Sequence, residues 1–135
     1  MNKIDNIEGV KRVANEILSR EKHTAIAFIN MKAEVEEIEI CQLLIDELKR
    51  RGNRCSMIEG TVTEKELKNK KEENDIVIVS AGAVDKSADA VEMAGYCDGA
   101  ILILKKGKVV GKNAIRIKNE LCRNKAKCFG TILVK

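Results

Sequence analysis

Residues 75–105 read DIVIVSAGAVDKSADAVEMAGYCDGAILILK, and this stretch decides the fold. The runs at 75–81 and 100–105 are continuously rather than alternately apolar, which is typical of strands buried on both faces of a parallel sheet. Asp85 is placed to cap the start of a helix that continues through Ala94. Because parallel strands need a crossover connection, this order of strand, helix and strand predicts a right-handed βαβ unit.

The same alternation extends to both sides of this unit. Three more strand-like runs lie at residues 24–30, 54–59 and 128–135, and a helical segment precedes the first of them. Apolar residues recur at helical spacing between the runs, in one stripe of Ile38, Cys41, Leu44, Ile45 and Leu48 and another of Ala114, Ile117 and Leu121. The pattern predicts an α/β fold: a single domain over residues 1–135, with a five-stranded parallel sheet in a three-layer sandwich.

Composition excludes several classes of protein. Hydrophobic residues make up 44% of the 135 residues and charged residues 34%, and proline is absent, which excludes collagen-like and disordered chains. The longest apolar stretches, residues 25–29 and 100–104, are far shorter than the roughly 20 residues of a membrane-spanning helix. The first residues carry charges where a signal peptide has its apolar core, so we expect a cytoplasmic protein without membrane insertion.

The cysteines and the histidine predict neither a metal nor a cofactor site. The five cysteines form no CxxC pair, and His23 is the one histidine that could assist them. This pattern supports neither zinc nor disulfides, and thiols within the apolar segments are expected to pack as small hydrophobic groups. Phe28, Tyr96 and Phe129 are the only aromatic residues, which leaves too few stacking platforms for nucleic acid.

Charge is divided unevenly along the chain. Residues 1–98 hold 15 Lys and Arg against 20 Asp and Glu, whereas residues 99–135 hold 10 against 1, so that a net charge of −5 is followed by one of +9. Such a split predicts weak, salt-sensitive self-association or the binding of a charged partner. The alternative is that the two sets of charges neutralise each other within one molecule.

The turn after the first strand is the place to look for a site, because ligands of open α/β sheets bind at the carboxyl ends of the strands. A phosphate cradle requires glycines, a lysine and a serine or threonine there. Residues 29–40 read INMKAEVEEIEI and offer four carboxylates instead, at Glu34, Glu36, Glu37 and Glu39. At about 4 Å and an effective dielectric of about 20, each would repel a phosphate charge by roughly 4 kcal/mol. The turn therefore predicts no nucleotide binding.

In layout, residues 7–134 nevertheless resemble a known family. The best-matching part is residues 75–135, in which the family's turns and closing strand are represented by Asp98-Gly99, Gly107 and Gly130. This part is similar to the cytoplasmic kinase domain of bacterial tyrosine autokinases of capsular and exopolysaccharide synthesis, a branch of the P-loop ATPases with a deviant Walker A motif. The resemblance implies a P-loop NTPase-like fold with strand order 2-3-1-4-5.

The resemblance also implies that the family's nucleotide-binding residues are replaced. Its two P-loop glycines fall on Glu34 and Glu36, its phosphate-binding lysine on Glu37, and its Ser-Thr pair on Ile38 and Glu39. The lysine position therefore has reversed charge. An acidic first turn is common in helices of every function, so this run alone does not decide between a changed site and an ordinary helix start.

Two further motifs of the family are altered. Its Walker A′ Asp falls on Glu59, which keeps the charge, and its Walker B Asp falls on Ser80, which loses it. The two prolines that usually follow fall on Gly82 and Ala83. Taken singly, Ser80 and Gly82 could shape an ordinary turn and Glu59 could be solvated. The joint change in three motifs needed for phosphoryl transfer favours loss of that chemistry.

The family's oligomerisation signature, Glu-x-x-Arg-x-x-Arg, lies in its N-terminal helix. It is represented here by Glu8, Lys11 and Ala14, so that it is half kept. Glu8 and Lys11 are the candidate oligomer contacts.

Together the residues predict a non-catalytic pseudokinase or pseudo-ATPase domain that acts in interaction or regulation. The resemblance implies a membrane chain-length regulator of polysaccharide synthesis, or an active paralogue, as its partner. Two alternatives stay open. One is a weak or altered nucleotide- or phosphate-dependent enzyme, such as a tyrosine autokinase or ATPase, that uses Lys32, Glu59 and Ser80. The other is a flavodoxin-like or receiver-like binding domain.

Overall fold

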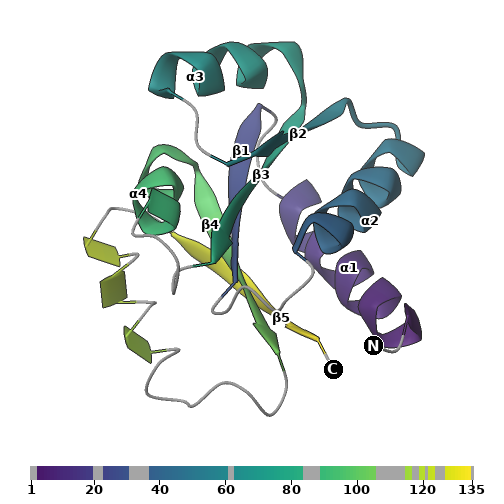
Figure 1. Cartoon of the computed structure of the whole chain (residues 1–135). Coiled ribbons are helices and arrows are strands. Elements are labelled where there is room, and N and C mark those ends of the chain that lie inside the picture. Colours follow the sequence, from purple (N-terminus) through teal and green to yellow (C-terminus); the bar gives the residue numbers. More distant parts are fainter. Residues whose placement is uncertain are drawn as a thin grey trace.

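The structure, a computed structural model, describes residues 3–19, 23–30, 37–60, 63–83, 89–105, 115–116, 119–120, 122–123 and 127–134. Helices and strands alternate through most of it (Figure 1). Helices α1 (Lys3–Leu18) and α2 (Glu37–Arg50) share a core with one face of a central sheet, and α3 (Glu64–Glu73) and α4 (Asp89–Tyr96) share a second core with the other face. The predicted α/β class is confirmed.

The strands of the sheet all run parallel. Their order is β2-β3-β1-β4-β5, and their bounds are β1 (Thr24–Asn30), β2 (Cys55–Glu59), β3 (Ile76–Ala83), β4 (Gly99–Lys105) and β5 (Cys128–Val134). The parallel sheet and the order 2-3-1-4 of the first four strands agree with the prediction. Because β3 lies between β1 and β2, the flavodoxin-like or receiver-like alternative, which needs the first two strands side by side, is wrong.

The middle strand, β1, is buried along its whole length, as its continuous apolar run predicts. Its side chains alternate between the two faces of the sheet. Ile26 and Phe28 pack in the cluster with α1 and α2, whereas Ala27 and Ile29 pack in the cluster with α3 and α4. Helices therefore cover both faces of the sheet at β1, and the described elements form three layers.

Helix α2 follows the predicted stripe with one exception. The stripe residues from Cys41 to Leu48 are buried against the sheet. Ile38 is instead 49% exposed, so its assignment to the core stripe is wrong. Ile40, in the same first turn of α2, is 1% exposed and packs in the core instead, so the buried face of this turn passes through Ile40 and leaves Ile38 beside it on the exposed side.

Helix α3 is polar and is attached by few apolar contacts. Leu67 is its one buried residue, and a capping box between Thr63 and Glu66 fixes its start. Capping of this kind satisfies backbone N–H groups that the first turn leaves unpaired. The predicted cap Asp85 and the second predicted stripe, Ala114, Ile117 and Leu121, lie outside the described residues.

Candidate functional site at the carboxyl edge of the sheet

Glu59 and Ser80 lie side by side where β2 and β3 approach their carboxyl ends. The two residues are register partners, and Ser80 also pairs with Phe28 of β1. Ser80 is buried, at 5% exposed, whereas Glu59 is exposed. The backbone N–H of Gly60 donates to the Ser80 carbonyl at 2.9 Å, and Gly60 adopts φ +82, a value that favours glycine. Glu59 and Ser80, which are 21 residues apart in the sequence, are thus neighbours in space.

Asn30 brings a third polar side chain to this edge. It ends β1, is 3% exposed, and pairs with Ala83 of β3 and Ile103 of β4. A register shift after Phe28 sets Ile29 opposite Gly82, so Gly82 lies within β3 and not in a turn beyond it. The sequence pattern did not identify Asn30, although it is the polar residue that closes the apolar run IAFIN.

The helix that follows β1 begins with acidic residues. Glu37 is the first residue of α2, and Glu39 is exposed beside Ile38. Negative charges near the amino end of a helix stabilise the helix, because this end of its dipole is positive. Lys32, Glu34 and Glu36 lie outside the described residues.

The described part of the edge has little of the chemistry of a magnesium–triphosphate site. Ser80 and Asn30 are neutral, and one exposed carboxylate, Glu59, ends β2. No group of three or more His, Cys, Asp or Glu that could hold a metal ion occurs within the described ranges. Lys105 ends β4, on the far side of β1 from Glu59. Hydroxyl, amide and carboxylate groups of this kind suit hydrogen bonding.

The oligomerisation positions on α1 do not share one exposed surface. Lys11 is exposed, but Ala14 is fully buried in the core between α1, α2 and the sheet. Glu8 lies in α1, and its side chain is not among those described. The third position of the signature therefore packs internally.

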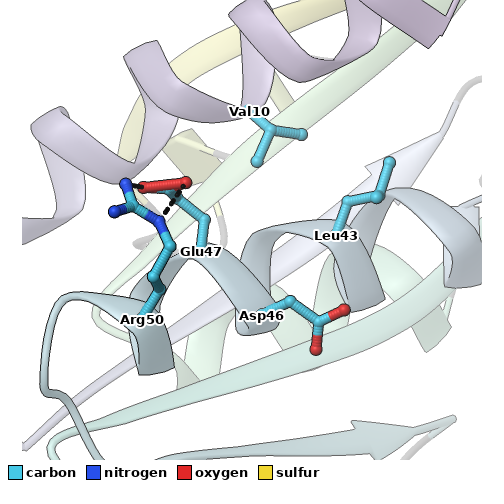
Figure 2. Close-up of a pocket in the computed structure, with 5 residues that line it drawn as sticks. All are labelled: Val10, Leu43, Asp46, Glu47 and Arg50. Carbon is cyan, nitrogen blue, oxygen red and sulfur yellow. Dashed lines mark hydrogen bonds and ion pairs between the residues drawn. The ribbon is translucent and has the colours of Figure 1, made fainter.

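A separate groove of about 210 Å³ lies between α1 and α2 (Figure 2). Val10 and Leu43 form its apolar part, and Asp46, Glu47 and Arg50 line the rest. Arg50 and Arg51 donate hydrogen bonds to the Glu47 carboxylate, and these lower the pKa of Glu47 to about 2. The Asp46 carboxylate points away from this pair and accepts from Gln42 at 3.0 Å. The charges of this groove are largely satisfied within the helix, and it does not adjoin Ser80.

The cysteines with described side chains behave mostly as packing residues. Cys41, Cys55 and Cys97 are buried free thiols, and Cys122 is exposed. Burial raises the pKa of Cys55 to about 11 and that of Cys97 to about 12, so both thiols stay protonated near neutral pH. The buried thiols are therefore poor nucleophiles.

No protein-family model and no curated protein matches this chain. Solved structures do match it. The VpsO kinase domain superposes with a TM-score of 0.80 at 8% identity, over 98% of this chain and 95% of that one. The kinase domain of the Escherichia coli tyrosine kinase ETK gives 0.77 at 13% identity, over 95% and 74%, and the BceF tyrosine kinase domain gives 0.75 at 11%, over 93% and 74%.

The fold is that of bacterial tyrosine kinase domains. The resemblance read from the sequence is confirmed at this level, and identities of 8–13% extend it no further than the fold. Within the described residues, no helix is long and apolar enough to cross a membrane.

Proposed function

We propose that this chain is a non-catalytic binding domain with a tyrosine kinase fold, a pseudokinase that does not bind Mg-ATP. Ser80 is the observation that carries the proposal. It occupies the position at which the resemblance places the acidic magnesium ligand, and it is a buried, neutral hydroxyl. Magnesium in phosphate sites is held by one or two carboxylates together with substrate phosphates, and a serine at this position of β3 cannot supply that charge.

The neighbours of Ser80 support the same proposal. Glu59 is one strand away but exposed, and the other side chain buried at this edge, Asn30, is neutral. In phosphoryl transfer the protein contributes mainly positioning and charge stabilisation. A site whose lysine position is Glu37 and whose Walker B position is Ser80 lacks both of the charges that this requires.

A weak or altered nucleotide-dependent enzyme is the second candidate. The register pairing of Glu59 with Ser80 favours it, because a carboxylate beside a hydroxyl is a recurrent catalytic combination. In that case Lys32 would have to supply the positive charge for the phosphates.

We further propose that the domain acts in the cytoplasm as one folded unit. Its partner would be a membrane chain-length regulator of polysaccharide synthesis or an active kinase of the same fold. The fold likeness to three kinase domains supports this choice of partner class, and the acidic first turn of α2 favours a partner surface that is basic.

Isothermal titration with millimolar Mg-ATP tests the proposal. The unaltered chain is expected to give no saturable heat, with an active kinase domain of the same fold as the positive control. The matched variant carries Glu37→Lys and Ser80→Asp together, which restores both charges at the two positions. A micromolar dissociation constant for the unaltered chain would overturn the proposal and promote the enzyme candidate, and phosphate release would then be measured in Lys32→Ala.

A further inference from the structure

Helix α3 is held to the rest of the domain by few apolar contacts. Leu67 is the one residue of α3 that is buried. Helix α2, by comparison, buries Ile40, Cys41, Leu44, Ile45 and Leu48. Segments with few buried apolar side chains open at a lower free energy than the core of the same domain. Detachment of α3 therefore costs less than detachment of α2.

Polar contacts hold the last turn of α3 and the residue that caps it. The Lys71 ammonium pairs with the Asp98 carboxylate at 2.9 Å, and the two side chains are 27% and 43% exposed. The His23 ring donates from Nδ1 to the Lys71 and Asn74 carbonyls. Ion pairs that water reaches contribute little to stability. The last turn is thus positioned by contacts near the surface of the domain more than by packing.

Cys97 lies close to this turn. It is 8% exposed, packs in the same core cluster as Leu67, and directly precedes Asp98, the partner of Lys71. Burial raises the pKa of the Cys97 thiol to about 12, with a further rise from Asp98 and an opposing effect of Lys71, which places Lys71 near the sulfur. The closed domain therefore keeps this thiol protonated and covered.

We propose that α3 opens as a unit from a sheet that stays folded, and that this opening makes Cys97 a site of modification by small disulfides such as oxidised glutathione. In the open state the thiol gives its proton to water. The thiolate then attacks one sulfur of the disulfide, whose S–S bond breaks. A new S–S bond joins Cys97 to half of the reagent, and the other half leaves as a thiolate.

The adduct has a structural consequence. A side chain that is 8% exposed in a packed core leaves no space for a glutathione group, so α3 cannot return to its place until the new bond is reduced. The inference does not depend on the proposed function, because Cys97 precedes β4 at the amino edge of the sheet, whereas Ser80 lies toward the carboxyl edge.

Cys55 is a matched internal control for the test. It is also 8% exposed, but it packs in the cluster that α1 and α2 cover. Burial raises the pKa of Cys55 to about 11, which is below that of Cys97, so in a closed domain Cys55 would be the more reactive thiol. Opening of α3 predicts the reverse order. Alkylation of the full chain by iodoacetamide, followed at each cysteine by peptide mass spectrometry, measures both rates without denaturant.

A pair of leucine variants separates local from global opening. Leu67→Ala is expected to accelerate labelling of Cys97 by about thirtyfold or more, the effect of removing a buried leucine side chain. Leu44→Ala makes the same change in the opposite core cluster. It should accelerate labelling of Cys41 and leave Cys97 unchanged, because Leu44 stays packed when only α3 is open.

Lys71→Ala is a milder variant that keeps the core intact. Loss of the ion pair with Asp98 should accelerate labelling of Cys97 by about two- to fivefold. Removal of a nearby cation would by itself make the thiol less reactive, so an increase reports opening. Lys68→Ala, at an exposed position of the same helix, is the control and should leave the rate unchanged.

The inference is overturned if Cys97 reacts no faster than Cys55, or if Leu44→Ala accelerates Cys97 as much as Cys41, since either result would mean that Cys97 is reached only by global unfolding. Oxidised glutathione is then added to the unaltered chain. One glutathione is expected on Cys97 of the folded protein and none on Cys55, and a Cys97 without the adduct would refute the modification.

Discussion

The two edges of the sheet at which the parallel strands begin and end, its amino and carboxyl edges, differ in the charge of their polar residues. At the amino edge, carboxylates stand before β3 and β4 and bond to the neighbouring strands. Toward the carboxyl edge, where ligands of such sheets bind, β3 carries the neutral Ser80, three residues before the strand ends at Ala83. The comparison teaches that Asp75 and Asp98 join neighbouring strands at the amino edge, whereas the buried polar side chain that β3 brings to the carboxyl edge is a neutral hydroxyl.

Two aspartates, Asp75 and Asp98, link neighbouring strands at the amino edge. The Asp98 carboxylate accepts from the Ala25 N–H at 2.8 Å and pairs with Lys71 at 2.9 Å, while its own N–H donates to the Ala25 carbonyl at 2.8 Å. Asp75 is 7% exposed and accepts from the Arg54 N–H at 3.0 Å, and its own N–H donates to the Arg54 carbonyl at 2.8 Å. The Asp75 carbonyl accepts from His23 and Thr24, so this residue joins β2, β3 and β1.

The largest effect is expected from breaking this edge with Asp75→Ala. The substitution leaves the Arg54 N–H without its acceptor and should lower the free energy of unfolding by about 2–3 kcal/mol. Urea denaturation measures it. Asp75→Asn is the control, because an amide oxygen can still accept from Arg54, and it should lose less than half as much. Equal losses in the two variants would contradict the role given to the backbone hydrogen bond.

A smaller effect is expected from His23, which ties the end of α3 to the start of β1. Its ring Nδ1 lies 2.7 Å from the Lys71 carbonyl and 2.9 Å from the Asn74 carbonyl, so this nitrogen carries the proton and donates. The backbone of His23 has φ 62, a left-handed conformation that costs a non-glycine residue about 1–2 kcal/mol.

His23→Ala is expected to lower the free energy of unfolding by about 1–2 kcal/mol, because it removes the donor and keeps the backbone cost. His23→Gly removes the same donor and relieves the backbone, and should therefore be more stable than the alanine variant. Urea denaturation of both variants checks the order. Equal stabilities would show that the backbone conformation stores no strain at this position.

The sequence predicts features that depend on neighbouring residues better than features that depend on contacts between distant strands. Continuous apolar runs are local signals, so β1 and β3 were placed within about one or two residues, and parallel pairing followed from burial on both faces. Glu59 pairs with Ser80, and Asp98 with Ala25, only because of the order of the strands, and the spacing of apolar residues does not indicate that order. The resemblance supplied the order, and with it the neighbours of Ser80. Neither source predicted Asn30 at the site, or the hydrogen bonds of His23, which was considered only as a companion ligand of the cysteines.

The smallest effect is expected at the carboxyl edge, from Glu59→Ala. Glu59 ends β2 as an exposed side chain, whereas Asp75 precedes β3 as a buried one, and the two lie at opposite ends of the same strand pair. Exposed positions outside caps and networks usually change stability by no more than about 0.5 kcal/mol, and we expect Glu59→Ala to stay within that range. Glu59→Gln separates loss of charge from loss of length, and both variants are measured by urea denaturation beside Asp75→Ala. A loss as large as that of Asp75→Ala would mean that the folded chain holds the Glu59 carboxylate as firmly as that of Asp75. The two edges would then be alike, and the enzyme candidate that uses Glu59 and Ser80 together would gain support.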